Sequence, residues 1–245
     1  IKIADIGSGY GLFLKGLKER GFSHLAAIEP NAEAARALRE NFGFEVHEAG
    51  LGDAGLPHGA FDAAILVAVI EHFTDPVGAL RDIRDILRPG GYLYVNTPNL
   101  GDVVLRQGWN KNFKFVHTFY FTETSLSNCL HKAGFEIVAS YNLPANLRYA
   151  GWLSPEHYSS GELNIIARSI GTGEMHAGAI RREDWREVET AVKRAWRRDR
   201  PYNFIRRVIG FFRARTPLGY PLKIIERRMR SQDLLSGVRV PNFRS

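Results

Sequence analysis

Cysteine is almost absent from this chain of 245 residues, in which Cys129 is the single example. One cysteine excludes a framework of intrachain disulfides and favours a reducing compartment, so we expect a cytoplasmic protein. The sequence also contains no run of 18 apolar residues and no secretory signal, which argues against a membrane-spanning helix. The length suits one α/β domain with an appendage.

Spacings typical of metal sites are missing as well. The histidines and the cysteine do not form an H-x-x-x-H or C-x-x-C pattern. We therefore expect no metal, and a metal-dependent enzyme has no support in the sequence.

Acidic residues are scarce only in the last part of the chain. Residues 176–245 hold 18 Lys and Arg against 7 Asp and Glu, whereas residues 1–175 hold 15 against 19, so the excess positive charge lies in the tail. Apolar residues at helical spacing predict helices over 182–199, 202–215 and 222–235. This basic tail could lie on a membrane surface, bind a polyanion, or pack on the domain or a second subunit. Nucleic acid is the least favoured partner because no RNA-binding motif is present.

The most informative segment that is present is the glycine-rich loop Asp5-Ile6-Gly7-Ser8-Gly9-Tyr10-Gly11. It follows an apolar strand end and precedes apolar residues at helical spacing that begin at Leu12. This layout is typical of nucleotide-type cofactor sites, because glycine lets the backbone approach a ligand and a helix N-terminus presents free N–H groups. A tight turn that merely needs glycine is the alternative interpretation.

The spacing of the glycines discriminates between cofactors. A dinucleotide fingerprint would require a third glycine where Leu12 stands, and a P-loop would require a Gly-Lys-Ser/Thr sequence, which is absent here. The carboxylate of Asp5 would repel a pyrophosphate, but it suits the cationic amine of S-adenosylmethionine (SAM).

A second acid supports a SAM site. Residues 24–28 predict a strand that ends in Glu29-Pro30-Asn31. An acid at the end of the second strand can accept hydrogen bonds from both ribose hydroxyls, although a surface glutamate at a strand end is the plainer alternative. Asn31 can cap the Ala-rich helix predicted over 32–41.

With these residues the chain resembles the class I SAM-dependent methyltransferases. Four later segments carry the same resemblance: Phe61–Val67, Val69–Pro76, Leu87–Leu93 and Ala133–Glu136. The resemblance implies an α/β fold with a Rossmann-like, mostly parallel sheet of seven strands and helices on both faces. It also implies an antiparallel hairpin of the sixth and seventh strands at one edge. It is closest to the group that acts on quinones, sugars and small metabolites.

We expect two parts in the chain, a class I SAM-dependent methyltransferase domain over 1–170 and a basic helical C-terminal extension over 171–245. Because Ile1 already lies in a predicted strand, we expect the natural protein to continue upstream. The resemblance implies helices there that cover the cofactor, so the domain is expected to be N-terminally truncated.

The resemblance also implies where the cofactor lies. The segment that begins at Leu51 would pass the adenine edge, with Asp53 a candidate acceptor for the exocyclic amine, and Gly50 stands where the family often has an acid. The predicted cofactor-binding residues are Asp5, Gly7, Ser8, Gly9, Gly11, Glu29, Pro30, Leu51, Gly52, Asp53, Val67 and Ala68.

Methyl transfer requires an acceptor atom held in line with the methyl group, and a hydroxyl acceptor also benefits from a base. The candidates near the carboxyl ends of the strands are Glu71, His72, Asn96, Asn99 and His117. We predict His117 as the base because histidine titrates near neutral pH, with a structural role in anchoring its loop as the alternative. The aromatic-rich loop 97–121 is predicted to cover the substrate.

The predicted function is SAM-dependent O-methylation of a hydroxyl on a sugar, a glycolipid or another small molecule. The aromatic loop and the basic tail suggest a glycan acceptor and peripheral contact with the inner face of a membrane. A quinone- or phenol-type O-methyltransferase is one alternative. Another is a non-catalytic SAM-binding module that assembles through its basic tail, and an oligomer is open in each case.

Overall fold

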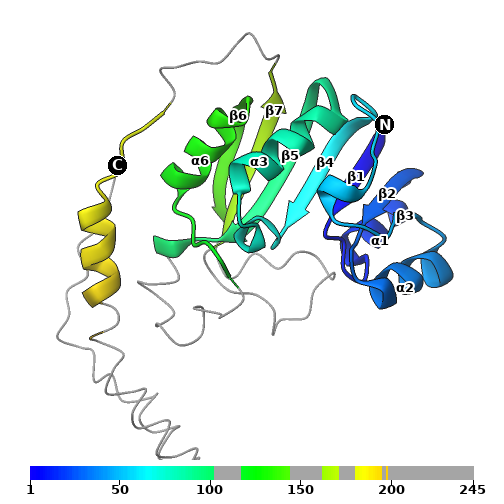
Figure 1. Ribbon diagram of the computed structural model, residues 1–245, viewed down its shortest axis with the longest axis horizontal. Coiled ribbons are helices and arrows are strands. Elements are labelled where there is room, and N and C mark those ends of the chain that lie inside the picture. Colours follow the sequence, from blue (N-terminus) through cyan, green and yellow to red (C-terminus); the bar gives the residue numbers. More distant parts are fainter. Residues whose placement is uncertain (102–116, 144–161, 171–179, 195–196, 198–245) are drawn as a thin grey trace, which may run out of the picture. The chain divides into compact units, whose positions relative to one another are not determined.

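The computed structural model describes residues 1–101, 117–143, 162–170, 180–194 and 197 (Figure 1). The chain divides into two units, residues 1–193 and 194–245, and every described strand belongs to the first unit. The helices predicted over 202–215 and 222–235 and most of the loop 97–121 lie outside the described residues.

Strands and helices alternate along the first unit. The strands are β1 (Lys2–Ile6), β2 (His24–Ile28), β3 (Glu45–His47), β4 (Phe61–Val67), β5 (Leu87–Pro98), β6 (Phe135–Leu143) and β7 (Glu162–Ser169). The helices are α1 (Leu12–Glu19), α2 (Ala32–Phe42), α3 (Pro76–Ile86) and α6 (Glu123–Lys132), with short 3-10 turns η1 (Leu51–Asp53) and η2 (Ile70–His72). Residues 185–194 are also helical, within the range 182–199 predicted for a helix.

The strands form one seven-stranded sheet in the order β3-β2-β1-β4-β5-β7-β6 (Figure 1). Neighbouring strands from β3 to β5 pair in parallel, whereas β7 is antiparallel to both β5 and β6. The predicted Rossmann-like, mostly parallel sheet and the antiparallel edge hairpin are confirmed. The hairpin inserts β7 rather than β6 beside β5.

Helices cover both faces of the sheet, as expected. One buried cluster joins alternate strand residues such as Ala4 and Leu93 to Leu80 of α3 and Leu126 of α6. The other joins Ile3 and Ile65 to helices α1 and α2. Because both faces of the sheet are buried, the central strands are apolar at nearly every position.

Side-chain caps fix where the helices begin. Asn31 Oδ1 accepts a hydrogen bond from Ala34 N at 2.9 Å, as predicted for the start of α2. Thr122 caps α6 in a capping box with Ser125. Within the described part of the chain, we find no helix with the length and apolarity of a membrane span.

Candidate cofactor site and active site

The sheet order reverses between β1 and β4, since β2 and β3 lie to one side of this pair and β5 to the other. Ligands of open α/β sheets bind beyond the carboxyl ends of the strands at such a switch point. The structure places Asp5 and the glycine loop at the end of β1, Glu29 at the end of β2, and Val67 at the end of β4.

The three predicted loop glycines adopt left-handed backbone conformations, with φ of 67° at Gly7, 52° at Gly9 and 73° at Gly11. A Cβ at Gly7 would lie 2.6 Å from Val69 Cγ2, and one at Gly11 would collide with Leu38. A side chain at either position would therefore strain the backbone and displace a neighbouring side chain. A Cβ at Gly9 would have no described atom within 4 Å, so Gly9 faces open space.

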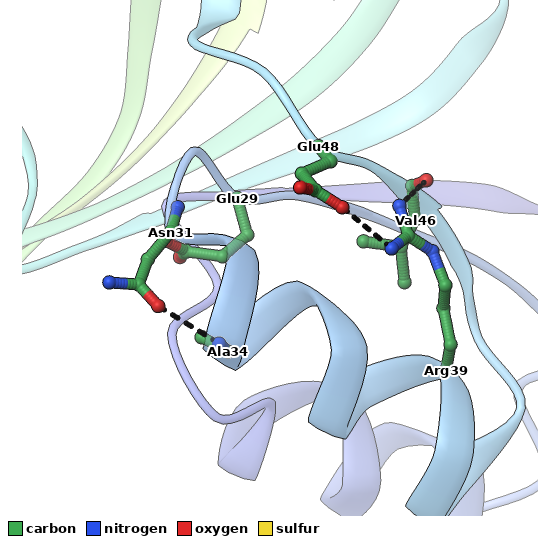
Figure 2. Close-up of polar contacts among 6 residues, drawn as sticks. All are labelled: Glu29, Asn31, Ala34, Arg39, Val46 and Glu48. Carbon is green, nitrogen blue, oxygen red and sulfur yellow. Dashed lines mark hydrogen bonds and ion pairs between the residues drawn. The ribbon is translucent and has the colours of Figure 1, made fainter.

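Glu29 is buried and holds the glycine loop in shape. Its Oε2 accepts a hydrogen bond from Gly9 N at 2.7 Å, and its Oε1 accepts one from Asn31 N at 2.8 Å. Figure 2 shows Glu29 and Asn31 together at the start of α2, and Pro30 between them is exposed. Each carboxylate oxygen can accept a further hydrogen bond, so Glu29 keeps the capacity for ribose hydroxyls.

Hydrogen bonds of Arg39 connect the end of β3 and the segment after it to α2. Arg39 donates to Glu48 Oε2 at 2.7 Å and to the carbonyl of Val46 at 3.2 Å (Figure 2). The ion pair is largely exposed and contributes little energy, but it holds the segment after β3 near Glu29.

Asp5 is 3% exposed, and burial, with the nearby charge of Glu29, raises the pKa of its carboxyl to about 8. A cationic ligand amine would favour the ionised form of this carboxyl and so lower the pKa. Ser8 adds a second signal, since its Oγ is buried and no described atom hydrogen-bonds it. A buried hydroxyl of this kind needs a partner that a ligand can supply, so the loop fits SAM.

The segment after β4 is strained beside the loop. Ala68 has φ of 53°, an uncommon conformation for a residue with a side chain, and its N–H donates to Asn96 O at 2.9 Å. Such strain persists where the surrounding structure imposes it and is common at ligand sites.

The predicted adenine residues form η1. Leu51 packs against the core cluster, whereas Gly52 and Asp53 are exposed. Their contact with adenine stays a prediction.

Three of the catalytic candidates come together. One ligating atom each from Glu71, His72 and His117 lies within 4.8 Å of the others, and the two imidazole rings meet edge to face at 4.9 Å. The carbonyl of Glu71 accepts hydrogen bonds from Thr118 N at 2.8 Å and Phe119 N at 3.1 Å, which brings the distant segment alongside η2. We expected no metal from local spacings, and such spacings could not have detected a set drawn from separate segments.

Glu71 is the buried member of this set. It is 1% exposed, and Thr97 Oγ1 donates to its Oε2 at 2.8 Å. Burial is the main reason the pKa of the Glu71 carboxyl lies above its usual value.

The two asparagine candidates have structural partners. Asn96 Nδ2 donates to Glu162 Oε2 and Asn164 Oδ1, each at 2.9 Å, and Tyr94 OH donates to the same Asn164 oxygen at 2.7 Å. Asn99 Oδ1 accepts from Gly101 N at 3.0 Å. Sequence reasoning missed Glu162 and Asn164, whose only signal was their polarity beside the apolar residues 163 and 165–167 of β7.

The comparison that decides the family is with sequence profiles. The profile of a family described as "Methyltransferase domain" matches residues 1–140. The chain belongs to this methyltransferase family. A tRNA U34 carboxymethyltransferase of Desulfotalea psychrophila is 30% identical over 171 residues, 64% of this chain and 53% of its own length. A ubiquinone biosynthesis O-methyltransferase of Ruegeria pomeroyi is 30% identical over 156 residues, 56% of this chain and 61% of its own length.

The chain thus spans between half and two thirds of the length of these curated relatives. Among solved structures, it resembles the 1,6-didemethyltoxoflavin-N1-methyltransferase of Burkholderia thailandensis, which holds S-adenosylhomocysteine. The TM-score is 0.52 at 19% identity, over 69% of this chain and 71% of that one. The predicted cofactor, SAM, agrees with the family and with a Mycobacterium tuberculosis relative described as a probable SAM-dependent methyltransferase.

Proposed function

We propose that the chain transfers the methyl group of SAM to a hydroxyl oxygen of a small-molecule acceptor. The observation that carries this proposal is the cluster of Glu71, His72 and His117 just beyond the end of β4. Val69, which precedes the cluster, packs against Gly7 of the cofactor loop, so the cluster adjoins the predicted cofactor site.

Bound SAM supplies an electrophilic methyl group. The acceptor oxygen forms a bond to the methyl carbon as the bond from carbon to sulfur breaks, leaving S-adenosylhomocysteine. The hydroxyl proton leaves to the cluster, where His117 is the predicted acceptor. A non-catalytic SAM-binding module would not need proton-accepting groups at this position, which favours catalysis.

The candidate acceptors belong to two classes, phenols on one side and sugars or glycolipids on the other. The ubiquinone biosynthesis O-methyltransferase among the relatives supports a phenol-type acceptor. The proposed sugar or glycolipid acceptor depends on the aromatic loop and the basic tail. Most of the loop, and the predicted tail helices over 202–215 and 222–235, lie outside the described residues.

Replacing His117 with alanine should lower the turnover number by about 100-fold, the usual contribution of a general base, and leave the affinity for S-adenosylhomocysteine unchanged. Turnover is measured as transfer of labelled methyl from SAM to separate panels of phenols and of sugars. The matched control is His58→Ala, at an exposed histidine in the loop before β4. Its turnover number should equal that of the wild-type protein. Unchanged turnover in His117→Ala would remove His117 as the base, and no transfer to any hydroxyl would overturn the proposed function.

A further inference from the structure

The cluster of Glu71, His72 and His117 has the donor set of a metal site. Their ligating atoms lie within 4.8 Å of one another. Donors around one ion at bond lengths near 2.1 Å stand up to about 4.2 Å apart, so closing on an ion requires only small side-chain movements. Because two donors are imidazoles, the set suits Zn²⁺, Co²⁺, Mn²⁺ or Fe²⁺ better than the oxygen-seeking Mg²⁺ and Ca²⁺.

The surroundings of Glu71 support a cation there. Its carboxylate is 1% exposed, and no lysine or arginine among the described residues forms an ion pair with it. Its side-chain partner is a neutral hydroxyl, that of Thr97 at 2.8 Å. A buried carboxylate is stabilised when an opposite charge shares its site, and a hydroxyl that orients a ligating carboxylate is a common outer partner of metal ligands.

The backbone also fixes the cluster. The carbonyl of Glu71 accepts hydrogen bonds from Thr118 and Phe119, the two residues that follow His117. His117 is therefore anchored beside η2 through its own chain neighbours. His72 is exposed and His117 is half-buried, which leaves a solvent-facing side from which an ion can enter.

We propose that Glu71, His72 and His117 bind one divalent transition-metal ion, with Thr97 as a positioning residue for Glu71. Three protein ligands leave coordination positions open, and the acceptor hydroxyl takes one of them. A bound ion would lower the pKa of that hydroxyl, which would lose its proton to solvent, and His117 would then serve as a ligand. Without the ion, His117 takes the proton directly, as the proposed function describes. The action of the ion on the hydroxyl rests on the proposed function, whereas binding of the ion does not.

The test uses Co²⁺, whose visible absorption reports its ligands, added to the full chain after removal of metals with a chelator. We expect one equivalent to bind saturably, Zn²⁺ to displace it, and millimolar Mg²⁺ to leave it in place. Glu71→Gln, which has nearly the same shape and keeps an acceptor for Thr97, should weaken Co²⁺ binding by at least about 100-fold. His58→Ala should bind Co²⁺ as the wild-type protein does. Thr97→Val should weaken binding about tenfold, and Thr97→Ser should restore it.

Methyl transfer from SAM, measured on the same samples, separates this proposal from the proposed function. Failure of saturable Co²⁺ binding, equal binding in Glu71→Gln, or displacement by Mg²⁺ would overturn the metal site even where methyl transfer is observed. Normal Co²⁺ binding without methyl transfer to any hydroxyl would instead overturn the proposed function. Full methyl transfer by Glu71→Gln in the presence of a chelator would overturn the proposed action of the ion on the acceptor hydroxyl.

Discussion

Replacing Asp5 with asparagine should stabilise the unliganded protein at pH 8 and weaken its binding of S-adenosylhomocysteine by about 100-fold. Both effects have one cause. Asp5 is buried next to Glu29, so its ionised form is unfavourable until a ligand brings a positive charge. The position is therefore suited to binding at the expense of the stability of the free protein.

The pH dependence arises from the raised pKa of Asp5, about 8 in the folded protein against 3.8 as the ordinary value. Between these values the unfolded chain is ionised at Asp5 while the folded protein keeps the proton. The contribution of the Asp5 carboxyl to the free energy of unfolding is thus fully present below about pH 4. It falls as the pH rises to about 8, by up to about 1.4 kcal/mol per pH unit. Asparagine does not titrate, so the variant avoids this loss.

Thermal unfolding of both proteins at pH 4 and pH 8 measures the effect. The melting temperature of Asp5→Asn should exceed that of the wild-type protein by roughly 5 °C or more at pH 8, and by little or nothing at pH 4. The affinity of the wild-type protein for S-adenosylhomocysteine should rise as the pH approaches 8, and that of the variant should not change in this way. A constant difference in melting temperature would show that Asp5 keeps an ordinary pKa.

Replacing Gly9 with alanine should lower the affinity for S-adenosylhomocysteine by about 10- to 100-fold while leaving the fold intact. The added methyl group would project into open space in the free protein, where the cofactor is predicted to lie. Overlap of that size with a ligand costs about 1–3 kcal/mol. Binding by calorimetry and unfolding by heat separate the two effects.

Gly43 offers the matched control for backbone strain. It ends α2 with φ of 64°, close to the 52° of Gly9, and a Cβ there also meets no described atom within 4 Å. Gly43→Ala should lose about as much stability as Gly9→Ala, about 1 kcal/mol, and keep full affinity for the ligand. Equal loss of affinity in both variants would mean that the effect of Gly9→Ala comes from strain rather than from occupied space.

Much of the fold could be predicted because its signals are local. The apolar run of β4, the glycine loop before α1 and the Asn31 cap of α2 are each contained in a few adjacent residues. The start of β5 was not predicted because residues 88–91 contain proline and two glycines, which read as a turn. In the structure Leu87 pairs with Phe61 before a register shift, so the strand begins ahead of that turn.

The site was predictable only in part, because only some of its residues are marked by a local pattern in the sequence. Asp5 and Glu29 stand at strand ends that the sequence indicates, but the hydrogen bond from Gly9 N to Glu29 depends on how two loops meet. The proximity of His117 to Glu71 depends on hydrogen bonds between segments far apart in the chain. Contacts between distant segments leave no local pattern in the sequence. The hydrogen bond by which Glu29 holds Gly9 and the proposed metal site both depend on such contacts.

The central claim is that the loop after β1 and Glu29 together form a SAM site, and calorimetric titration with S-adenosylhomocysteine tests it most directly. The wild-type protein should bind one equivalent saturably, and Glu29→Ala should bind at least about 100-fold more weakly, because it loses the ribose acceptor and the bond that holds Gly9. Thermal unfolding confirms that the variant is folded. Equal affinity in a folded Glu29→Ala, or no saturable binding by the wild-type protein, would contradict the account.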